Sequence, residues 1–205
     1  MRLNRAQARQ RNHDALIAAA MVEMADNGYT AARLEDIAAR AEVTTGAIYS
    51  IFGSKQDLML AAVRQLADDF AAGLLPLEGS EETLAETLRE IATAYHRAAV
   101  GPPAQQRLAF ELELMSLALR DPVDGRKFIQ AIPQRSEDVL TRLLTGRRIT
   151  AHPRAPRTTA EQARRLSPAV ASLLGGLLQR AVIEPGSVDE EYCARAAVAL
   201  VALTR

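Results

Sequence analysis

The sequence has little of what stabilises small secreted domains. Among its 205 residues there are one cysteine and no tryptophan, and only four Phe and four Tyr. A single cysteine cannot form an internal disulfide, which excludes a disulfide-stapled scaffold. Because 48% of the residues are apolar, a chain of this length can bury a substantial core. The composition therefore excludes a disordered chain as well.

Long apolar segments are also missing. The longest uncharged, mainly apolar run covers residues 166–179, which is shorter than the ~20 residues that cross a bilayer. The first residues, Met-Arg-Leu-Asn-Arg, are not followed by the apolar core of a secretory signal. We therefore expect a soluble, cytoplasmic protein that makes no use of a membrane.

A surplus of positive charge is absent too, since 25 Lys and Arg balance 25 Asp and Glu. Nucleic-acid partners normally require a basic surface, so the average charge argues against them. The distribution is uneven, however. Residues 1–13 hold four Arg and no acidic residue, and residues 147–165 hold six Arg against one Glu, so the rest of the chain is acidic. We interpret the second basic segment as a solvated loop and the first as a candidate arm.

Apolar residues recur at spacings of three and four almost throughout, and no run shows the alternation of a strand. The pattern predicts an all-α fold of about nine helices without an internal repeat. Gly28 is expected to end the first helix, and Ser80, followed by two Glu, to begin the fifth. The expected helices cover 14–27, 34–41, 45–52, 54–72, 80–99, 103–119, 122–146, 159–181 and 188–204.

The second and third of these helices are short and are separated by three residues. This spacing is that of a helix-turn-helix, whose second helix lies in the major groove of DNA. Ile37 and Ile48 are placed to pack between the helices, whereas the small residues from Thr44 to Ala47 stay exposed. Small side chains allow the start of the second helix to approach a base edge or a phosphate without a clash.

The run LEDIAARAEVTTGAIYSIFGSKQDL, from Leu34 to Leu58, together with Gly28-Tyr29, resembles the DNA-binding head of the tetracycline-repressor (TetR/AcrR) family. The match spans about 45 contiguous residues. It implies a three-helix head at 1–55 and a helical body at 56–205 that binds a ligand and dimerises. The expected function is that of a sequence-specific transcriptional regulator, by family default a repressor released from a palindromic operator by a small, largely hydrophobic effector.

Candidate DNA-binding residues follow from the exposed face of the motif and from the resemblance. Thr45, Gly46 and Ala47 are assigned to bases, and Thr44, Tyr49 and Lys55 are assigned to phosphates, with Arg33 as a further phosphate candidate. The alternative roles are a helix cap for Thr44, a packed aromatic for Tyr49 and a solvated helix start for Lys55. The full set is Arg33, Thr44, Thr45, Gly46, Ala47, Tyr49, Ser50 and Lys55.

The chain departs from the family pattern at several positions. Glu42 stands where Gly is usual, at a turn position that favours a left-handed backbone; this costs on the order of 1 kcal/mol. Ala32-Arg33 replaces a frequent Thr pair, which removes a hydroxyl cap, and Ile51 replaces a frequent His that would contact phosphate. The arginines at positions 2–11 could restore these phosphate contacts as an arm that follows phosphates or enters the minor groove. The alternative is that they form a frayed, solvated tail without such contacts.

The body is less specified by its sequence. The family layout places a pocket among its helices, and the candidate ligand-binding residues are Leu66, Phe70, Leu88, Tyr95, His96, Phe110, Glu111, Leu114, Met115 and Phe128. Two apolar helices near the end of the sequence suit a four-helix homodimer interface. Its candidate residues are Val170, Leu173, Leu174, Leu177, Ala197 and Val201. Both sets have the alternative interpretation of ordinary core within one subunit.

Two other functions remain open at this stage. The first is a DNA-binding dimer whose body takes no small molecule. The second, an all-helical enzyme, lacks support, because His13, His96 and His152 are far apart and Cys193 stands alone in an apolar helix. No Gly-rich phosphate loop is present, so we expect neither catalysis nor a metal or cofactor.

Overall fold

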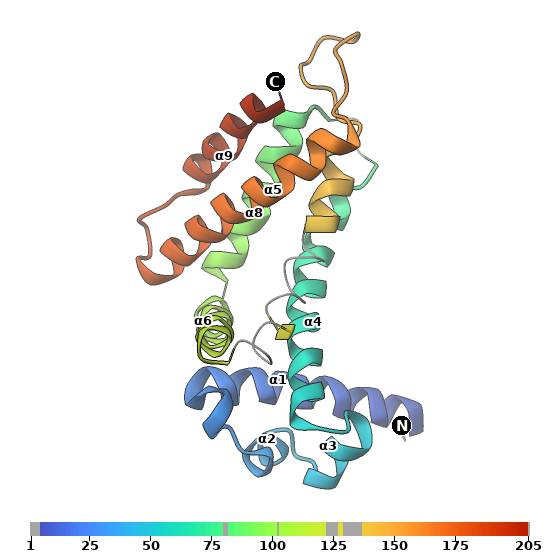
Figure 1. The fold of residues 1–205 in the computed structure, drawn as a ribbon, viewed down its shortest axis with the longest axis vertical. Coiled ribbons are helices and arrows are strands. Elements are labelled where there is room, and N and C mark those ends of the chain that lie inside the picture. The colour runs from blue at the N-terminus through green and yellow to red at the C-terminus, as the bar shows by residue number, and fades with distance from the viewer. Residues whose placement is uncertain (1–4, 80–81, 102, 122–126, 129–136, 205) are drawn as a thin grey trace. The chain divides into compact units, whose positions relative to one another are not determined.

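The protein is described here by a computed structural model covering residues 5–79, 82–101, 103–121, 127–128 and 137–204 (Figure 1). Over these ranges the regular structure is helical, and the only extended pairing consists of isolated bridges that join Arg148 to Thr83 and to Arg157. The expected all-α class with an N-terminal helix-turn-helix is therefore confirmed.

The chain forms two compact units. The first comprises Met1–Ala67 and Gln106–Ile132, and the second comprises Asp68–Gln105 and Pro133–Arg205. The sequence-based division of function at residue 55 stays a prediction. The structure adds that a later segment, 106–132, packs with the N-terminal residues.

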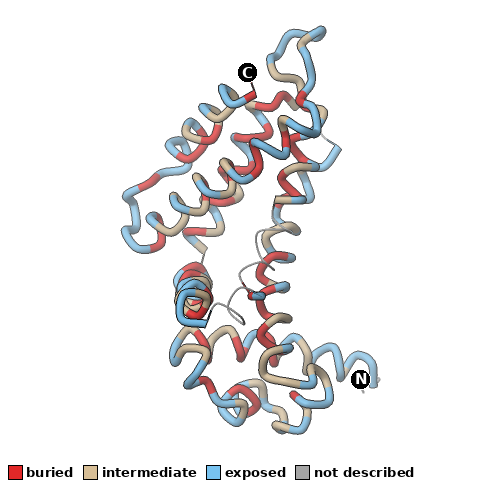
Figure 2. Tube along the Cα trace, viewed as in Figure 1, coloured by how far each residue is buried: buried red, intermediate tan, exposed pale blue. Residues whose placement is uncertain are grey.

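The core of the first unit holds the helix-turn-helix in place. Leu16, Ile37, Ile48, Leu58 and Phe110 are fully buried in one cluster. Figure 2 shows buried positions in each contributing helix. These helices are α1 (Arg5–Ala31), α2 (Leu34–Arg40), α3 (Thr45–Ile51), α4 (Lys55–Leu74, which continues into the second unit) and α6 (Ala104–Arg120).

The first helix is longer than its apolar pattern predicts. α1 begins at Arg5 rather than near residue 14, because its first turns carry Ala6 and Ala8 but no large apolar residue that the pattern could reveal. The predicted break at Gly28 is confirmed, since this residue has φ 77° and ψ 160° inside the helical span. One further turn follows, closed by a hydrogen bond from Ala32 N to Gly28 O of 3.0 Å.

The turn of the motif contains the left-handed residue that the sequence suggests. Glu42 has φ 55°, and it is the non-glycine residue with positive φ in the described part of the chain. Backbone bonds from Glu42 N to Ala39 O and from Val43 N to Ala38 O hold the turn closed. The turn therefore keeps its shape with a residue whose Cβ is disfavoured there.

Replacing Glu42 with Gly should stabilise the first unit by about 1 kcal/mol, because glycine adopts this backbone without steric strain. Chemical denaturation followed by circular dichroism measures the change in the free energy of unfolding. Glu42→Ala is the matched control, since it removes the carboxylate and keeps the strain. A gain in Glu42→Ala equal to that in Glu42→Gly would assign the effect to charge and not to backbone conformation.

The second unit is built around α5 (Leu84–Val100), which packs against α8 (Ala160–Ile183) and α9 (Glu190–Ala199). Leu88, Ile91 and Ala92 of α5 are fully buried. Short 3-10 helices lie at Leu75–Leu77 and Leu200–Thr204. Residues 137–144 are also helical, as are 127–128; the remainder of the helix expected at 122–146 lies outside the described residues.

The start of α5 differs from the prediction. The helix begins at Leu84, where the Thr83 side chain accepts from Glu86 N and the Glu86 side chain accepts from Thr83 N. Such a reciprocal capping box stabilises a helix start more than acidic residues alone. The sequence analysis placed the start at Ser80, which lies outside the described residues. It overlooked Thr83 because the two preceding Glu fit a first turn equally well.

The second basic segment is an ordered turn and only in part a solvated loop. Gly146 N donates to Thr158 O and Thr158 N donates to Arg147 O, each at 2.8 Å. Arg147 is buried, with bonds from its guanidinium to Leu143 O and Leu77 O. Arg154 and Arg157 are exposed. Arg157 also donates to Gly146 O at 2.7 Å, so the segment uses part of its positive charge within the protein.

Among the residues that the structure describes, one helix is long and apolar enough to cross a membrane by length and composition, which differs from the sequence expectation. This is α8, with a mean hydropathy of 1.4 in its most apolar 18-residue window, of which 33% is buried. Leu166, Val170 and Leu174 pack inside the second unit. Core packing accounts for this part of the apolar composition.

Candidate nucleic-acid interface

The helix-turn-helix is assembled by backbone caps and one apolar anchor. Ala41 N bonds to Ile37 O at 3.0 Å to close α2, and Thr44 in extended conformation precedes α3. Ile48 is fully buried against the core, so the orientation of α3 about its own axis is set by this side chain. The residues on the other side of α3 are turned outward as a consequence.

The outward side of α3 carries most of the residues assigned to DNA. Tyr49 is 57% exposed, and Thr44, Gly46 and Ser50 are exposed as well. Thr45 and Ala47 are half-buried. A Cβ at Gly46 would meet only Thr44 Oγ1 at 3.7 Å, so the surface at this point is open. The sequence-predicted face is thus accessible, and its role in reading bases stays a prediction.

Arg33 lies at the start of α2, exposed, with its Nε 3.8 Å from Glu35 Oε2. It is the N-cap residue of α2, and no side chain caps the helix there. The loss of a hydroxyl cap at this position, inferred from the sequence, agrees with this geometry. An exposed guanidinium in a surface ion pair is weakly held and can turn to a phosphate.

Lys55 is engaged within the protein. Its Nζ donates to Tyr29 O at 2.5 Å and to Ala32 O at 2.6 Å, and it lies 4.7 Å from the centre of the Tyr29 ring. Partial burial lowers the pKa of Lys55 by desolvation. A cation on the last carbonyls of a helix is a C-terminal cap, so the ammonium already has a structural role. A phosphate contact by Lys55 remains a prediction.

Replacing Lys55 with Ala should lower the free energy of unfolding by about 1–3 kcal/mol, because the carbonyls at the end of α1 lose a charged donor. If capping α1 is the whole role of Lys55, the salt dependence of DNA binding stays unchanged. Arg33→Ala is the comparison: loss of a phosphate contact reduces the slope of log K against log salt by about 1. A reduced slope in Lys55→Ala would instead identify Lys55 as a phosphate contact.

The N-terminal arginines lie on a helix and not on a flexible arm. Arg5, Arg9 and Arg11 all belong to α1, while Arg2 lies outside the described residues. The Arg9 guanidinium reaches Ser50 O of α3 at 3.5 Å, and the His13 ring stacks on Phe52 at 5.0 Å. The start of α1 is therefore attached to the end of α3, so residues 5–11 are not frayed. Contact of these arginines with DNA stays a prediction.

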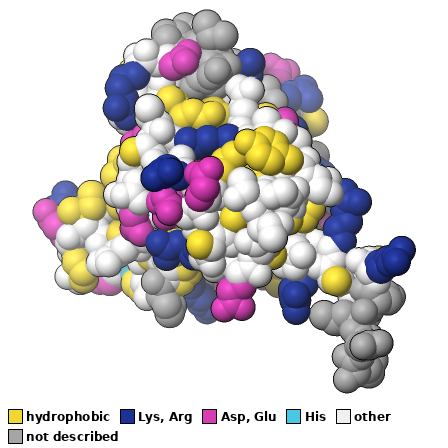
Figure 3. Space-filling view, turned by 90° about the horizontal axis from the view of Figure 1, so that it is seen from below, with side chains coloured by type: hydrophobic (Ala, Val, Ile, Leu, Met, Phe, Trp, Pro, Cys, Tyr) yellow, Lys and Arg dark blue, Asp and Glu magenta, His cyan; other side chains and the backbone are white. Residues whose placement is uncertain are grey.

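Positive charge on the molecule is dispersed. On the face shown in Figure 3, the dark blue Lys and Arg side chains are separated by white and magenta ones. Residues 1–55 hold seven basic and six acidic residues. Any affinity of this unit for DNA must rest on a few placed contacts, because bulk attraction to phosphates scales with net basic charge.

The ten residues predicted to bind a ligand are divided between the two units. Leu66, Phe110, Glu111, Leu114, Met115 and Phe128 belong to the first, and Phe70, Leu88, Tyr95 and His96 to the second. Many of them already have partners inside their own unit.

In the first unit, the fully buried Phe110 and Phe128 join the core around α1, and Met115 is 45% exposed. Burial raises the pKa of Glu111, and the charge of Arg107 opposes this rise. In the second unit, Tyr95 meets Phe70 edge-on with ring centres 4.6 Å apart, and His96 Nε2 lies 3.3 Å from Val188 O.

Two grooves open on the surface of α1, with volumes of about 580 and 370 Å³. The larger is lined by α1 and by Arg40, Ala41 and Glu42, and neither is lined by any of the ten predicted ligand residues. Across the described residues, no group of three or more His, Cys, Asp or Glu is placed to hold a metal ion.

The predicted dimer residues fall on two sides of their helices. Val170, Leu174 and Ala197 are buried within the second unit, whereas Leu173, Leu177 and Val201 are half-buried. The first three therefore act as core, the alternative that the sequence left open. A Cβ added at Gly175 or Gly176 would meet nothing within 4 Å. The accessible apolar side of α8 is the one that carries Leu173, Gly176 and Leu177.

Sequence reasoning missed a charged contact at the end of α1. Glu113 of α6 accepts a hydrogen bond from Tyr29 N at 3.0 Å and lies 3.3 Å from the Arg120 guanidinium. Gly28 was singled out as a helix end, but the acceptor of the next amide, Tyr29 N, is 84 residues away in the sequence and no local pattern marks it. Only the packing of α6 in the first unit reveals this pair.

The fold and the exposed α3 define a helix-turn-helix DNA-binding protein. Residues 16–62 match the family model described as bacterial regulatory proteins, tetR family. The match covers the N-terminal domain of that family, and the fold over nearly the whole length of this chain is similar to that of solved structures described as TetR-family regulators. The resemblance seen in the sequence is thereby confirmed.

Solved structures similar to this one cover almost all of the chain. A proposed transcriptional regulator from Pseudomonas aeruginosa PAO1 is 18% identical, with a TM-score of 0.74 over 98% of this chain and 91% of that one. The multidrug binding protein EbrR in complex with imidazole is 23% identical (TM-score 0.63, coverage 92% and 93%). The fatty acid degradation regulator FadR from Bacillus halodurans is 18% identical (TM-score 0.62, coverage 92% and 93%). No curated protein matches the chain by sequence.

Proposed function

We propose that this protein is a cytoplasmic transcriptional repressor that binds a palindromic operator as a homodimer and is released by a small, largely hydrophobic ligand. The observation that carries the DNA-binding part is the geometry of α3. Buried Ile48 anchors the helix, and the accessible Gly46 and Tyr49 lie on its outward surface. A short helix anchored on one side and open on the other can enter the major groove.

The accessible apolar side of α8 supports dimerisation. Leu173 and Leu177 stand one turn apart with exposed Gly176 between them, and Val201 is half-buried beyond α9. Small residues let two helices approach closely, and a two-fold axis repeats one patch on both subunits. Two copies of α3 would then read half-sites about one DNA turn, ~34 Å, apart or a multiple of it.

The ligand part rests on weaker support. The solved structure of EbrR is of a multidrug binding protein and that of FadR is of a regulator of fatty acid degradation, which favours apolar effectors for this fold. Four of the ligand candidates keep accessible or perturbed groups: Glu111, whose pKa is raised by burial, exposed Met115, and half-buried Phe70 and His96. Fully buried groups such as Leu88 and Phe110 line a pocket only after rearrangement.

A DNA-binding dimer without a ligand is the second candidate. It is favoured by the tight packing of predicted pocket residues, since Leu88, Phe110 and Phe128 have no exposed surface. Native mass spectrometry of the purified protein separates the two candidates. A co-purified small molecule, or an added one that releases the protein from DNA, supports a repressor with an effector. The absence of both results supports a DNA-binding dimer without a ligand.

Selection of bound fragments from genomic DNA tests the proposal as a whole. We expect enrichment of fragments that share a palindrome, and protection of both half-sites by one dimer in footprinting. Genes beside the selected site then suggest the chemistry of the effector. Failure to enrich any sequence over input, with a folded protein at low salt, would overturn the proposal.

A further inference from the structure

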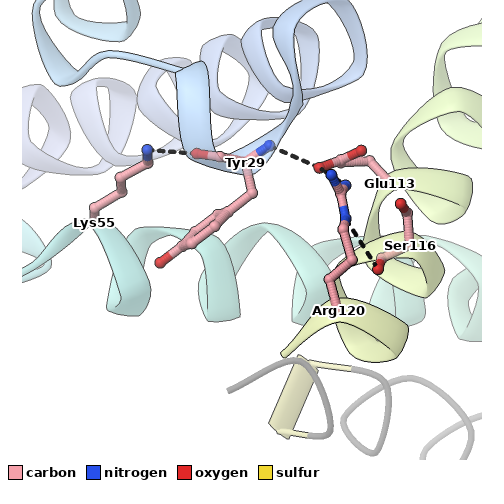
Figure 4. Close-up of polar contacts among 5 residues, drawn as sticks. All are labelled: Tyr29, Lys55, Glu113, Ser116 and Arg120. Atoms are coloured by element: carbon pink, nitrogen blue, oxygen red, sulfur yellow. Dashed lines mark hydrogen bonds and ion pairs between the residues drawn. The ribbon is translucent and has the colours of Figure 1, made fainter. Parts of the chain in front are cut away.

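The end of α1 is held by side chains from two other helices of the first unit. Figure 4 shows Lys55 of α4 bonded to the carbonyl of Tyr29, and Glu113 of α6 bonded to its amide. Both backbone polar atoms of Tyr29, its N–H and its carbonyl oxygen, are therefore bonded to side chains. Two residues that are far apart in the sequence meet at this point only because α4 and α6 both pack against α1.

Gly28 makes the contact from α6 possible. With φ 77° and ψ 160° it breaks the regular helix just before Tyr29, and Tyr29 N donates to Glu113 Oε1 at 3.0 Å. A Cβ built at Gly28 would lie 3.1 Å from Glu113 Oε1, which is tighter than ordinary contact. The backbone conformation therefore favours glycine here, and a Cβ would in addition press on the Glu113 carboxylate.

The carboxylate itself is oriented by Arg120. Its Nη2 lies 3.3 Å from Glu113 Oε1, and its Nε donates to Ser116 O at 3.4 Å. The Glu113 side chain is 19% exposed, whereas that of Arg120 is 64% exposed. A largely buried carboxylate that accepts from a backbone N–H forms a charge-assisted bond, which is stronger than a neutral one.

The held residue leads directly into the DNA-reading motif. Only Ala32 and Arg33 separate the end of α1 from α2, and Lys55 binds Ala32 O as well as Tyr29 O. Any change in direction at Tyr29 is therefore passed to α2, and through the closed turn at Glu42 to α3. The orientation of α3 depends on how firmly Tyr29 is held.

We propose that Glu113 is a positioning residue for the DNA-reading helices, acting through the Tyr29 amide. This inference rests on the proposed function as a DNA-binding regulator. It predicts that the carbonyl-type acceptor at Glu113 matters for DNA affinity, while its charge and its partner Arg120 matter less. No contact between Glu113 and DNA is required.

Three variants separate positioning from general stability. In Glu113→Ala the Tyr29 amide loses its acceptor, and its hydrogen exchange should accelerate about tenfold. Affinity for the selected operator should fall about fivefold, the range found for substitutions that act between distant groups. Glu113→Gln keeps an oxygen acceptor and should restore both readouts to within about twofold. Glu161→Ala, in an exposed ion pair on α8, is the matched control and should change neither.

The outcomes decide the inference in each case. Faster Tyr29 exchange together with weaker DNA binding in Glu113→Ala, and rescue by Glu113→Gln, support it. Unchanged affinity in Glu113→Ala, or equal loss in Glu113→Gln, overturns it. If Glu113→Ala does not fold, Arg120→Ala and Glu113→Gln are compared instead. A loss of DNA affinity in both variants would show that the charge of Glu113, and not its oxygen acceptor, is required, which overturns the inference. If the wild-type chain binds no operator, the proposed function fails instead.

Discussion

Gly46→Glu should abolish operator binding while leaving the fold as stable as before, or more so. Gly46 stands in the first turn of α3, exposed, and a Cβ there meets only Thr44 Oγ1 at 3.7 Å. Replacing glycine within a helix raises its intrinsic stability by about 0.5–1 kcal/mol, and a first-turn carboxylate also suits the helix dipole. The substitution therefore introduces no folding defect.

The loss of binding has an electrostatic cause. If α3 enters the major groove, the new carboxylate faces phosphates and electronegative base edges in a confined space. Like charges brought together at an interface cost several kcal/mol, so the affinity should fall by about 100-fold or more. Fluorescence anisotropy with the selected operator measures the affinity, and thermal unfolding measures the stability.

Two controls identify the source of the effect. Gly46→Gln has almost the same size without the charge and should retain more binding than Gly46→Glu. Gly73→Glu places the same charge at an exposed helical glycine of α4 with open space around it and should leave binding unchanged. Normal affinity of Gly46→Glu for the operator would show that α3 does not read DNA.

Leu177→Glu should convert the protein to a monomer and weaken operator binding by about 100-fold or more. Leu177 is half-buried on the accessible apolar side of α8, so a charge there is tolerated in one subunit but is buried unpaired in a two-fold interface. Linked binding of two heads gains about 10²–10⁴ in affinity over one head. A monomer loses this gain even though each head is intact.

Sedimentation equilibrium at micromolar concentration measures the oligomeric state, and anisotropy measures binding to full and half operators. Leu119→Glu is the matched control, because Leu119 is 85% exposed on α6 and lies outside the candidate interface. It should stay dimeric with normal affinity. A dimeric Leu177→Glu protein would show that the interface lies elsewhere on the molecule.

The two helices and the turn of the helix-turn-helix could be predicted from the sequence, because they depend on interactions between residues that are close in the chain. The helices at 34–40 and 45–51 were predicted to within one residue at each end. The family resemblance marked the position of Glu42 as one where a left-handed backbone is common, and Glu42 has φ 55°. Both depend on interactions within a few residues, such as the bond from Val43 N to Ala38 O.

Predictions that depended on which side of a helix is covered were less successful. Val170 and Leu174 were assigned to a dimer interface, and both are buried within the second unit. Periodicity marks an apolar side but does not say whether the same chain or another one covers it. The start of α1 at Arg5 was missed for the opposite reason, since its exposed turns carry no apolar signal.

By itself, the sequence determined the all-helical class, the helix-turn-helix with its turn at Glu42, and the resemblance of the head to TetR-family regulators. These features arise from residue spacing and backbone preference, which are properties of short segments. Only the tertiary structure decided that Lys55 caps α1, and that Glu113 holds the Tyr29 amide across 84 positions of sequence. Such contacts depend on how helices pack, because a hydrogen bond forms only where folding brings its two atoms together.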